Sequence, residues 1–168
     1  MKVKVFLTSL ILFSFSSAYS IEADVWEYKV QPGHMNEAVE LFEEAITLSR
    51  AAGRNTSILQ QNFGKGGEFK FHWVDFHNSL EERAKDKAYD SADYSDFITR
   101  FYASGAVTTV RSYTMTLIDD QLCNNAGVVE VYVWKPNSGM FSSVVEEFKA
   151  SREFFEKHGW EVDLWQEN

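Results

Sequence analysis

The chain repeats part of its own sequence, and this repeat is the strongest constraint on its fold. The stretch from Val25 to Asn62 returns in the stretch from Val129 to Asn168, with Asn137 and Ser138 as a short insertion in the second copy. Repetition of one supersecondary unit indicates the same local structure in both copies. The matched pairs are Tyr28 with Tyr132, Pro32 with Pro136, Gly33 with Gly139, Val39 with Val145, Phe42 with Phe148, Gly53 with Gly159, Gln60 with Gln166 and Asn62 with Asn168.

Each copy predicts a strand, a turn that contains proline, a helix, a glycine stop and a second strand. In the first copy, Trp26, Tyr28 and Val30 alternate along the chain as in a strand. The apolar residues from Met35 to Ser49 then follow the spacing of an amphipathic helix. Gly53 predicts the end of that helix because glycine tolerates positive φ.

The segment between the copies predicts a strand over 68–76, a helix beginning at Ser79, a second helix beginning at Ser91 and a long strand over 107–118. Ser79 and Glu82 have the spacing of a capping box. The order of elements is therefore βαββαβ followed by βαβ.

We therefore predict an α+β fold with a ferredoxin-like βαββαβ unit over residues 21–118 and a βαβ half repeat over residues 128–168. The strand over 68–76 is apolar on both faces: Phe71 and Trp73 lie on one face, together with Phe69, whereas Val74 and Phe76 lie on the other. A sheet that is apolar on both faces needs a cover on each. The helices cover one face, and a second sheet or another chain is expected to cover the other.

The first twenty residues have the layout of a secretory signal peptide. Two lysines precede an apolar run from Val5 to Phe15, and small residues follow it. The run is shorter than the roughly 20 residues of a membrane-spanning helix. We expect residues 1–20 to be removed and residues 21–168 to form a single domain, exported to the periplasm or the cell exterior without a stable membrane anchor.

Charge and cysteine content limit the partners of the chain. The net charge is −9, and it becomes more acidic once the two lysines of the leader are removed. An acidic surface repels phosphate backbones, so nucleic acid is not an expected partner. Cys123 is the single cysteine, which excludes an intramolecular disulfide. Aromatic residues make up 15% of the chain, and they provide large buried areas or flat ligand-contact surfaces.

Two segments carry a resemblance to a known family. The stretch Val25-Trp26-Glu27-Tyr28-Lys29-Val30-Gln31-Pro32-Gly33 resembles the opening of NIPSNAP-like proteins, and the stretch from Phe71 to Arg83 resembles their strand-to-helix segment. These families belong to the dimeric α/β-barrel superfamily, alongside the antibiotic-biosynthesis monooxygenases. The resemblance implies a fold of the dimeric α/β-barrel type and a possible homodimer. The superfamily includes cofactor-free oxygenases, haem-degrading enzymes, small-molecule binders and members without an assigned activity.

The haem-degrading relatives use an Asn near the first strand and a Trp and a His on helices. This chain has Glu27 and Tyr28 in the first strand, and it has His72 and Trp73 on a strand. That residue set does not carry over, so we expect no haem. His72 and His77 point to opposite faces of a regular strand and cannot share a metal. No zinc spacing, phosphate loop or dinucleotide fingerprint occurs in the sequence, so we expect neither a metal nor a cofactor.

The candidate site is a set of polar and aromatic side chains expected in the interior of a barrel. An apolar cavity with a few convergent polar groups is typical of a small-molecule site. The alternative is that these aromatic residues belong to the core and the charges lie at strand ends or an interface. The function we expect is binding of a small apolar or aromatic molecule or of a protein partner, with a cofactor-free monooxygenase-like enzyme as the alternative. The candidates are Glu27, His72, Trp73, Asp75, Arg111 and Tyr113.

Overall fold

The protein has a mixed α+β fold built on one open antiparallel sheet. A computed structural model describes residues 21–62, 69–89, 91–119 and 130–168. Within these residues the strand order is β2-β3-β1-β4-β5, and all neighbouring strands are antiparallel. The elements are β1 (Glu22–Val30), α1 (Met35–Ala51), β2 (Asn55–Gln61), β3 (Lys70–His77), α2 (Leu80–Ala88), α3 (Ala92–Ala103), β4 (Val107–Asp119), α4 (Phe141–Lys157) and β5 (Leu164–Glu167).

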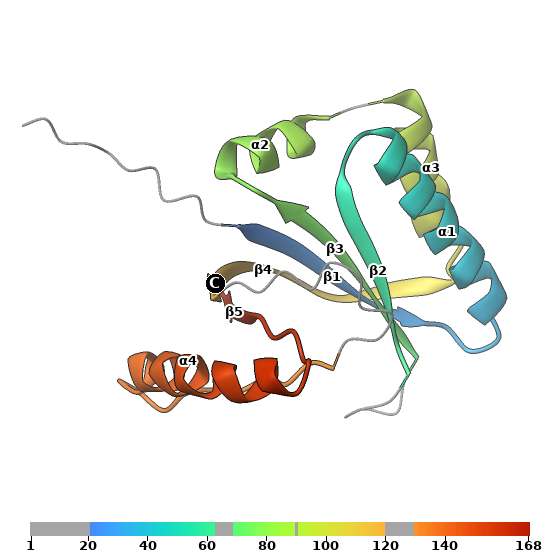
Figure 1. The fold of residues 1–168 in the computed structure, drawn as a ribbon. Coiled ribbons are helices and arrows are strands. Elements are labelled where there is room, and N and C mark those ends of the chain that lie inside the picture. Colours follow the sequence, from blue (N-terminus) through green and yellow to red (C-terminus); the bar gives the residue numbers. More distant parts are fainter. Residues whose placement is uncertain (1–20, 63–68, 90, 120–129) are drawn as a thin grey trace, which may run out of the picture.

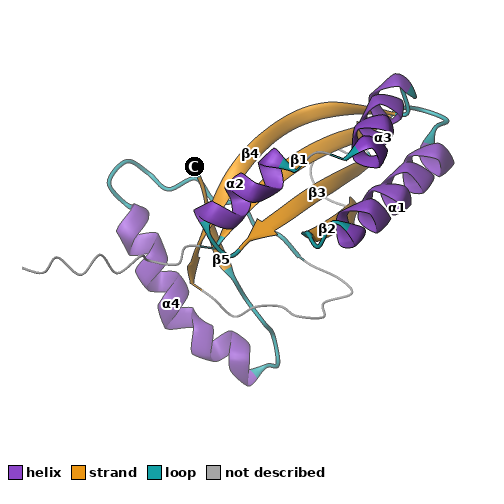
Figure 2. Ribbon diagram, turned by 90° about the horizontal axis from the view of Figure 1, so that it is seen from above, coloured by secondary structure: helices purple, strands orange, loops and turns teal. Residues whose placement is uncertain are grey.

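The helices lie on both sides of this sheet (Figure 1). α1, α2 and α3 lie on one side, and α4 lies on the other side. The view from above shows α1 running alongside α3 over the strands, while α4 lies apart from them (Figure 2). We call the sheet face away from α1 and α3 the open face.

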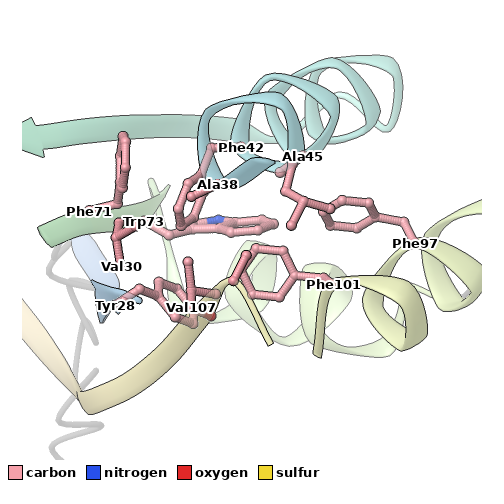
Figure 3. Close-up of a cluster of buried hydrophobic side chains, with 12 residues drawn as sticks. Tyr28, Val30, Ala38, Phe42, Ala45, Phe71, Trp73, Phe97, Phe101 and Val107 are labelled. Carbon is pink, nitrogen blue, oxygen red and sulfur yellow. The ribbon is translucent and has the colours of Figure 1, made fainter. Parts of the chain in front are cut away.

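The main core lies between the sheet and the helices α1 and α3 (Figure 3). Helical spacing puts Ala38, Phe42 and Ala45 on one side of α1, where all three are buried. The Phe42 ring lies 4.5 Å from the Phe71 ring and 5.5 Å from the Phe101 ring, measured between centroids. Burial of one such aromatic side chain stabilises the fold by about 1.5–3 kcal/mol.

The two predicted helix starts between the copies are confirmed. The Ser79 hydroxyl accepts a hydrogen bond from the Glu82 backbone N–H at 3.1 Å, and the Ser91 hydroxyl accepts one from the Tyr94 N–H at 3.2 Å. The Glu82 carboxylate reaches the Asn78 N–H, one residue before the cap, at 2.8 Å. Each cap satisfies a helix-end donor that has no partner within the helix.

The helix of the second copy is confirmed with the length of its counterpart. α1 and α4 both span 17 residues. Gly33 and Gly139 have φ of 84° and 78° before these helices, and Gly53 and Gly159 have φ of 74° and 75° after them. These left-handed conformations favour glycine, which explains why all four positions are kept in the repeat.

The first strand predicted for the second copy is not formed. Residues 130–136 carry no strand, although their counterpart β1 lies at the centre of the sheet. The second strand of the copy is present as β5, which pairs with β4. β4 is paired with β1 along its other edge, so the place next to β4 that the repeat predicts for residues 130–136 is already taken by β1.

The covered and open faces of β3 alternate as the sequence predicts. Phe71 and Trp73 are buried under the helices, and Val74 is buried on the open face. Phe69, which precedes β3, is the exception because 58% of it is exposed. Among the described residues, no helix is both long and apolar enough to cross a membrane.

Candidate functional site

Four of the six predicted site residues lie together on the open face. The strand register places Glu27 of β1 opposite His72 of β3 on one side and Arg111 of β4 on the other. Tyr113 lies two residues farther along β4, opposite Val25. Because side chains two residues apart share a face of a strand, these four residues form one polar and aromatic row across the sheet.

The centre of this row is a buried carboxylate held by two cations. Glu27 accepts a hydrogen bond from Lys70 Nζ at 2.7 Å and one from Arg111 Nε at 3.0 Å. Burial by itself would raise the pKa of Glu27, but the hydrogen bonds from Lys70 and Arg111 outweigh it and lower that pKa. Arg111 also reaches the Glu167 carboxylate of β5, at 3.3 Å. Glu27 is therefore ionised and fixed in position, and it orients Arg111.

Arg111 connects the charged row to an apolar cluster. Its guanidinium carbon lies 4.2 Å from the centroid of the Tyr113 ring, a cation–π contact. Burial raises the pKa of the Tyr113 hydroxyl, although Arg111 opposes the shift. Tyr113 packs against a second apolar cluster on the open face, which contains Ala23, Val25, Val74, Phe76, Met115 and Trp165.

His72 supplies a neutral imidazole to the same face. Burial lowers the pKa of His72, and the nearby Glu27 carboxylate opposes this only in part. Its Nε2 lies 3.5 Å from the Gln61 side-chain oxygen of β2. A half-buried neutral imidazole is able to accept or donate a hydrogen bond, or to take up a proton.

Trp73 and Asp75 do not join this row. They lie on the helix-covered face, as expected for odd positions of β3 when His72 is on the other face. The Asp75 carboxylate accepts hydrogen bonds from Trp73 Nε1 at 2.8 Å and from the Thr56 hydroxyl at 2.6 Å. Trp73 is part of the core, as the alternative interpretation had it, whereas the charged Asp75 is buried beside it and not at a strand end or an interface.

The sequence interpretation missed a buried ionic cluster beneath α2. Arg83 of α2 donates to both carboxylate oxygens of Asp24 in β1, at 2.9 and 2.6 Å, and the Thr114 hydroxyl donates to the same carboxylate at 3.0 Å. His77 lies between Asp24 and Asp86, with nitrogen–oxygen distances of 3.4 and 3.1 Å. No local signal distinguishes Asp24 in the sequence, because β1 also carries Glu22, Glu27 and Lys29.

The environment of Asp24 shifts its protonation strongly. Burial alone would raise the pKa, but the hydrogen bonds from Arg83 and Thr114, with the charges of Arg83 and Lys87, lower the pKa of Asp24 to about 2. Asp24 is therefore ionised at all physiological pH values. The Asp24 carboxylate is buried and paired within the protein, which favours a structural role.

The expectation that the two histidines of β3 lie on opposite faces is confirmed. His72 lies on the open face, whereas His77 shares the covered face with Asp75. Within the described part of the chain, no group of three or more His, Cys, Asp or Glu residues is arranged to hold a metal ion. Cys123 lies outside the described residues, as does the predicted leader.

Comparisons with known proteins identify neither a family nor a function for this chain. No protein-family model, no curated protein and no solved structure matches this sequence or its fold.

Proposed function

We propose that the protein is an exported binding module of the ferredoxin-like, dimeric α/β-barrel type, and that its open face binds a small apolar or aromatic molecule. The order β2-β3-β1-β4, with α1 and α3 on one side, supports the ferredoxin-like part of this proposal. The NIPSNAP-like segments support the superfamily. If the protein is exported, its leader is cleaved. The mass of the chain recovered outside the cytoplasm tests this, and we expect the mass of a chain that begins near Ile21.

One observation carries the binding proposal: on the open face a fixed ionic row borders an apolar cluster, whose outer residues Phe76, Tyr113, Met115 and Trp165 are only partly buried. Arg111 is 46% exposed, although it is held by Glu27 and stacked on Tyr113. A planar ligand is able to lie against Tyr113 and the apolar cluster while an anionic substituent meets the outer side of the guanidinium. Arg111 is held in place before a ligand arrives, so little conformational entropy is lost on binding.

The test uses the anionic aromatic dye 1-anilinonaphthalene-8-sulfonate as a probe. We expect saturable fluorescence enhancement with the folded mature chain, and about tenfold weaker binding for Arg111→Gln and for Tyr113→Ala, which corresponds to about 1.4 kcal/mol. The matched control is Arg100→Gln. Arg100 is 56% exposed, pairs with Glu44 and lies over the Phe97 ring, but it belongs to α3 on the other side of the sheet. Equal binding by all three variants and the unchanged protein would contradict the proposed site.

A cofactor-free oxygenase is the second candidate, and the neutral imidazole of His72 favours it. In that case His72 would take the phenolic proton of an aromatic substrate, O₂ would add to a ring carbon of the phenolate, and the hydroperoxide would lose water to leave a quinone, so that one oxygen atom enters the product and one leaves as water. Oxygen uptake with a hydroquinone, abolished in His72→Gln while folding is unchanged, is the required result. The absence of uptake above that of a protein-free solution would leave the binding module as the function.

A further inference from the structure

Residues 130–136 expose apolar side chains in both directions. Val131 and Val133 are 72% and 81% exposed, and the alternating Tyr132 and Trp134 are 62% and 60% exposed. None of the described strands pairs with this segment. A strand that is apolar on both faces is typical of the centre of a sheet, where neighbours and covering layers shield it. The segment therefore has the composition of a central strand without the surroundings of one.

The internal repeat shows which surroundings are missing. In the first copy, the counterpart β1 is paired on both edges, with β3 and with β4. In the second copy, β5 pairs with β4 as β2 pairs with β3. Residues 130–136 would need the edge of β4 that faces away from β5, and that edge is already paired with β1. Within its own chain, the segment therefore has no central position between two strands such as the one that β1 occupies.

The helix of the second copy lacks a packing surface as well. α1 buries five residues, whereas no residue of α4 is buried. α4 nevertheless keeps a half-buried stripe that includes Val144, Val145, Phe148 and Phe155 at helical spacing. β5 ends the sheet, so its outer edge has no strand partner within the described chain. The half repeat therefore offers an unpaired apolar segment, a helix without a buried residue and the open outer edge of β5.

We propose that a second copy of this chain supplies what the half repeat lacks. The first unit consists of two interlocked βαβ halves, β1-α1-β2 and β3-α2-α3-β4, whose first strands, β1 and β3, pair antiparallel at the centre. Two chains bring two spare βαβ halves. Residues 130–136 of each copy then pair antiparallel with the same residues of the other copy across a two-fold axis, and their outer edges lie along the β5 strand of the other copy.

The sequence of the segment suits this symmetric pairing. With Val133 on the two-fold axis, Tyr132 of one copy lies opposite Trp134 of the other, and Val131 lies opposite Lys135. Aromatic cross-strand pairs stabilise a sheet by roughly 0.2–1 kcal/mol each. A two-fold contact is self-complementary and closed, so it ends at a dimer. A second copy is therefore favoured over an unrelated partner, because each half repeat is half of a unit that this chain already builds.

The mass of the mature chain in solution, measured by sedimentation at micromolar concentration, is the first test. We expect a dimer, and we expect the double variant Val131→Lys, Val133→Lys to raise its dissociation constant at least 100-fold while the circular dichroism spectrum and melting behaviour are retained. The control is Leu80→Lys, since Leu80 is also a largely exposed apolar residue, 62% exposed, but belongs to α2. A monomeric unchanged chain, or a dimer that tolerates the double variant, would overturn the proposal.

A cross-link tests the register independently. In a Cys123→Ser background, Val133→Cys places two thiols opposite each other at the 4.5–5.5 Å Cα separation of paired strands, which a disulfide spans. Oxidation is expected to give a covalent dimer in high yield, whereas Val110→Cys, on exposed β4, is expected to stay monomeric on a denaturing gel. Equal cross-linking of both variants would refute the symmetric register. Neither test depends on the dye-binding site, so the two proposals fail separately.

Discussion

Replacement of Phe101 by alanine is expected to lower the free energy of unfolding by about 3–5 kcal/mol. Phe101 is 1% exposed. Its ring centroid lies 5.3 Å from that of Tyr28, 5.5 Å from that of Phe42 and 5.6 Å from that of Phe97. Since these rings come from β1, α1 and α3, the side chain joins the sheet to both helices. Loss of the ring leaves a cavity that the close-packed aromatic residues fill only in part.

Denaturant unfolding followed by far-ultraviolet circular dichroism measures this loss. Phe69→Ala is the matched control because the same ring is removed from an exposed position, and we expect a change below about 0.5 kcal/mol. Phe101→Leu is expected to fall between the two. If Phe101→Ala and Phe69→Ala destabilise equally, the core described between the sheet and the helices is incorrect.

Acid is expected to remove about 2 kcal/mol of stability through Asp24 alone. The pKa of Asp24 is about 2 in the folded protein, against 3.8 for the ordinary group, and each unit of difference corresponds to 1.36 kcal/mol. The folded state binds this proton less readily than the unfolded state does. The contribution is therefore complete above pH 4 and is lost as the pH falls towards 2.

The variant Asp24→Asn tests this dependence. We expect lower stability at neutral pH, because Arg83 and His77 lose a charged partner, and an acid limb of the stability profile that is flatter by about 2 kcal/mol. Glu81→Gln is the control: Glu81 also pairs with a cation, Lys85, but both side chains are exposed, and the profile should keep its shape. An acid limb that is unchanged in Asp24→Asn would show that other groups govern the acid transition.

Local patterns were sufficient to predict the elements of the first unit. The alternation along β1 and β3, the helical spacing of α1 and the capping serines at Ser79 and Ser91 are all governed by near neighbours in sequence, and all four features are present in the structure. The open and covered faces of β3 followed from the same alternation. The order of the strands in the sheet was harder to predict from the sequence, because each strand pairs only with an edge of a neighbouring strand that is still free.

The candidate site shows the same division. Alternation brought Glu27, Arg111 and Tyr113 to one face, but Trp73 and Asp75 were grouped with them by residue type, and the odd positions of β3 face the helices. Lys70 was overlooked, although it completes the ionic row. The contacts around Asp24 join residues from β1, α2 and β4. No local sequence pattern indicates a cluster whose members lie so far apart in the chain.

The main core is complete before the second copy begins. All buried members of the aromatic cluster lie between Tyr28 and Val107, and Trp165 is the one residue beyond β4 in the smaller cluster on the open face. Substitutions over residues 130–160 thus meet few packing constraints from the first unit. Substitutions there would leave the main core intact, so divergence in this region would alter the proposed association of two chains before it endangered the fold.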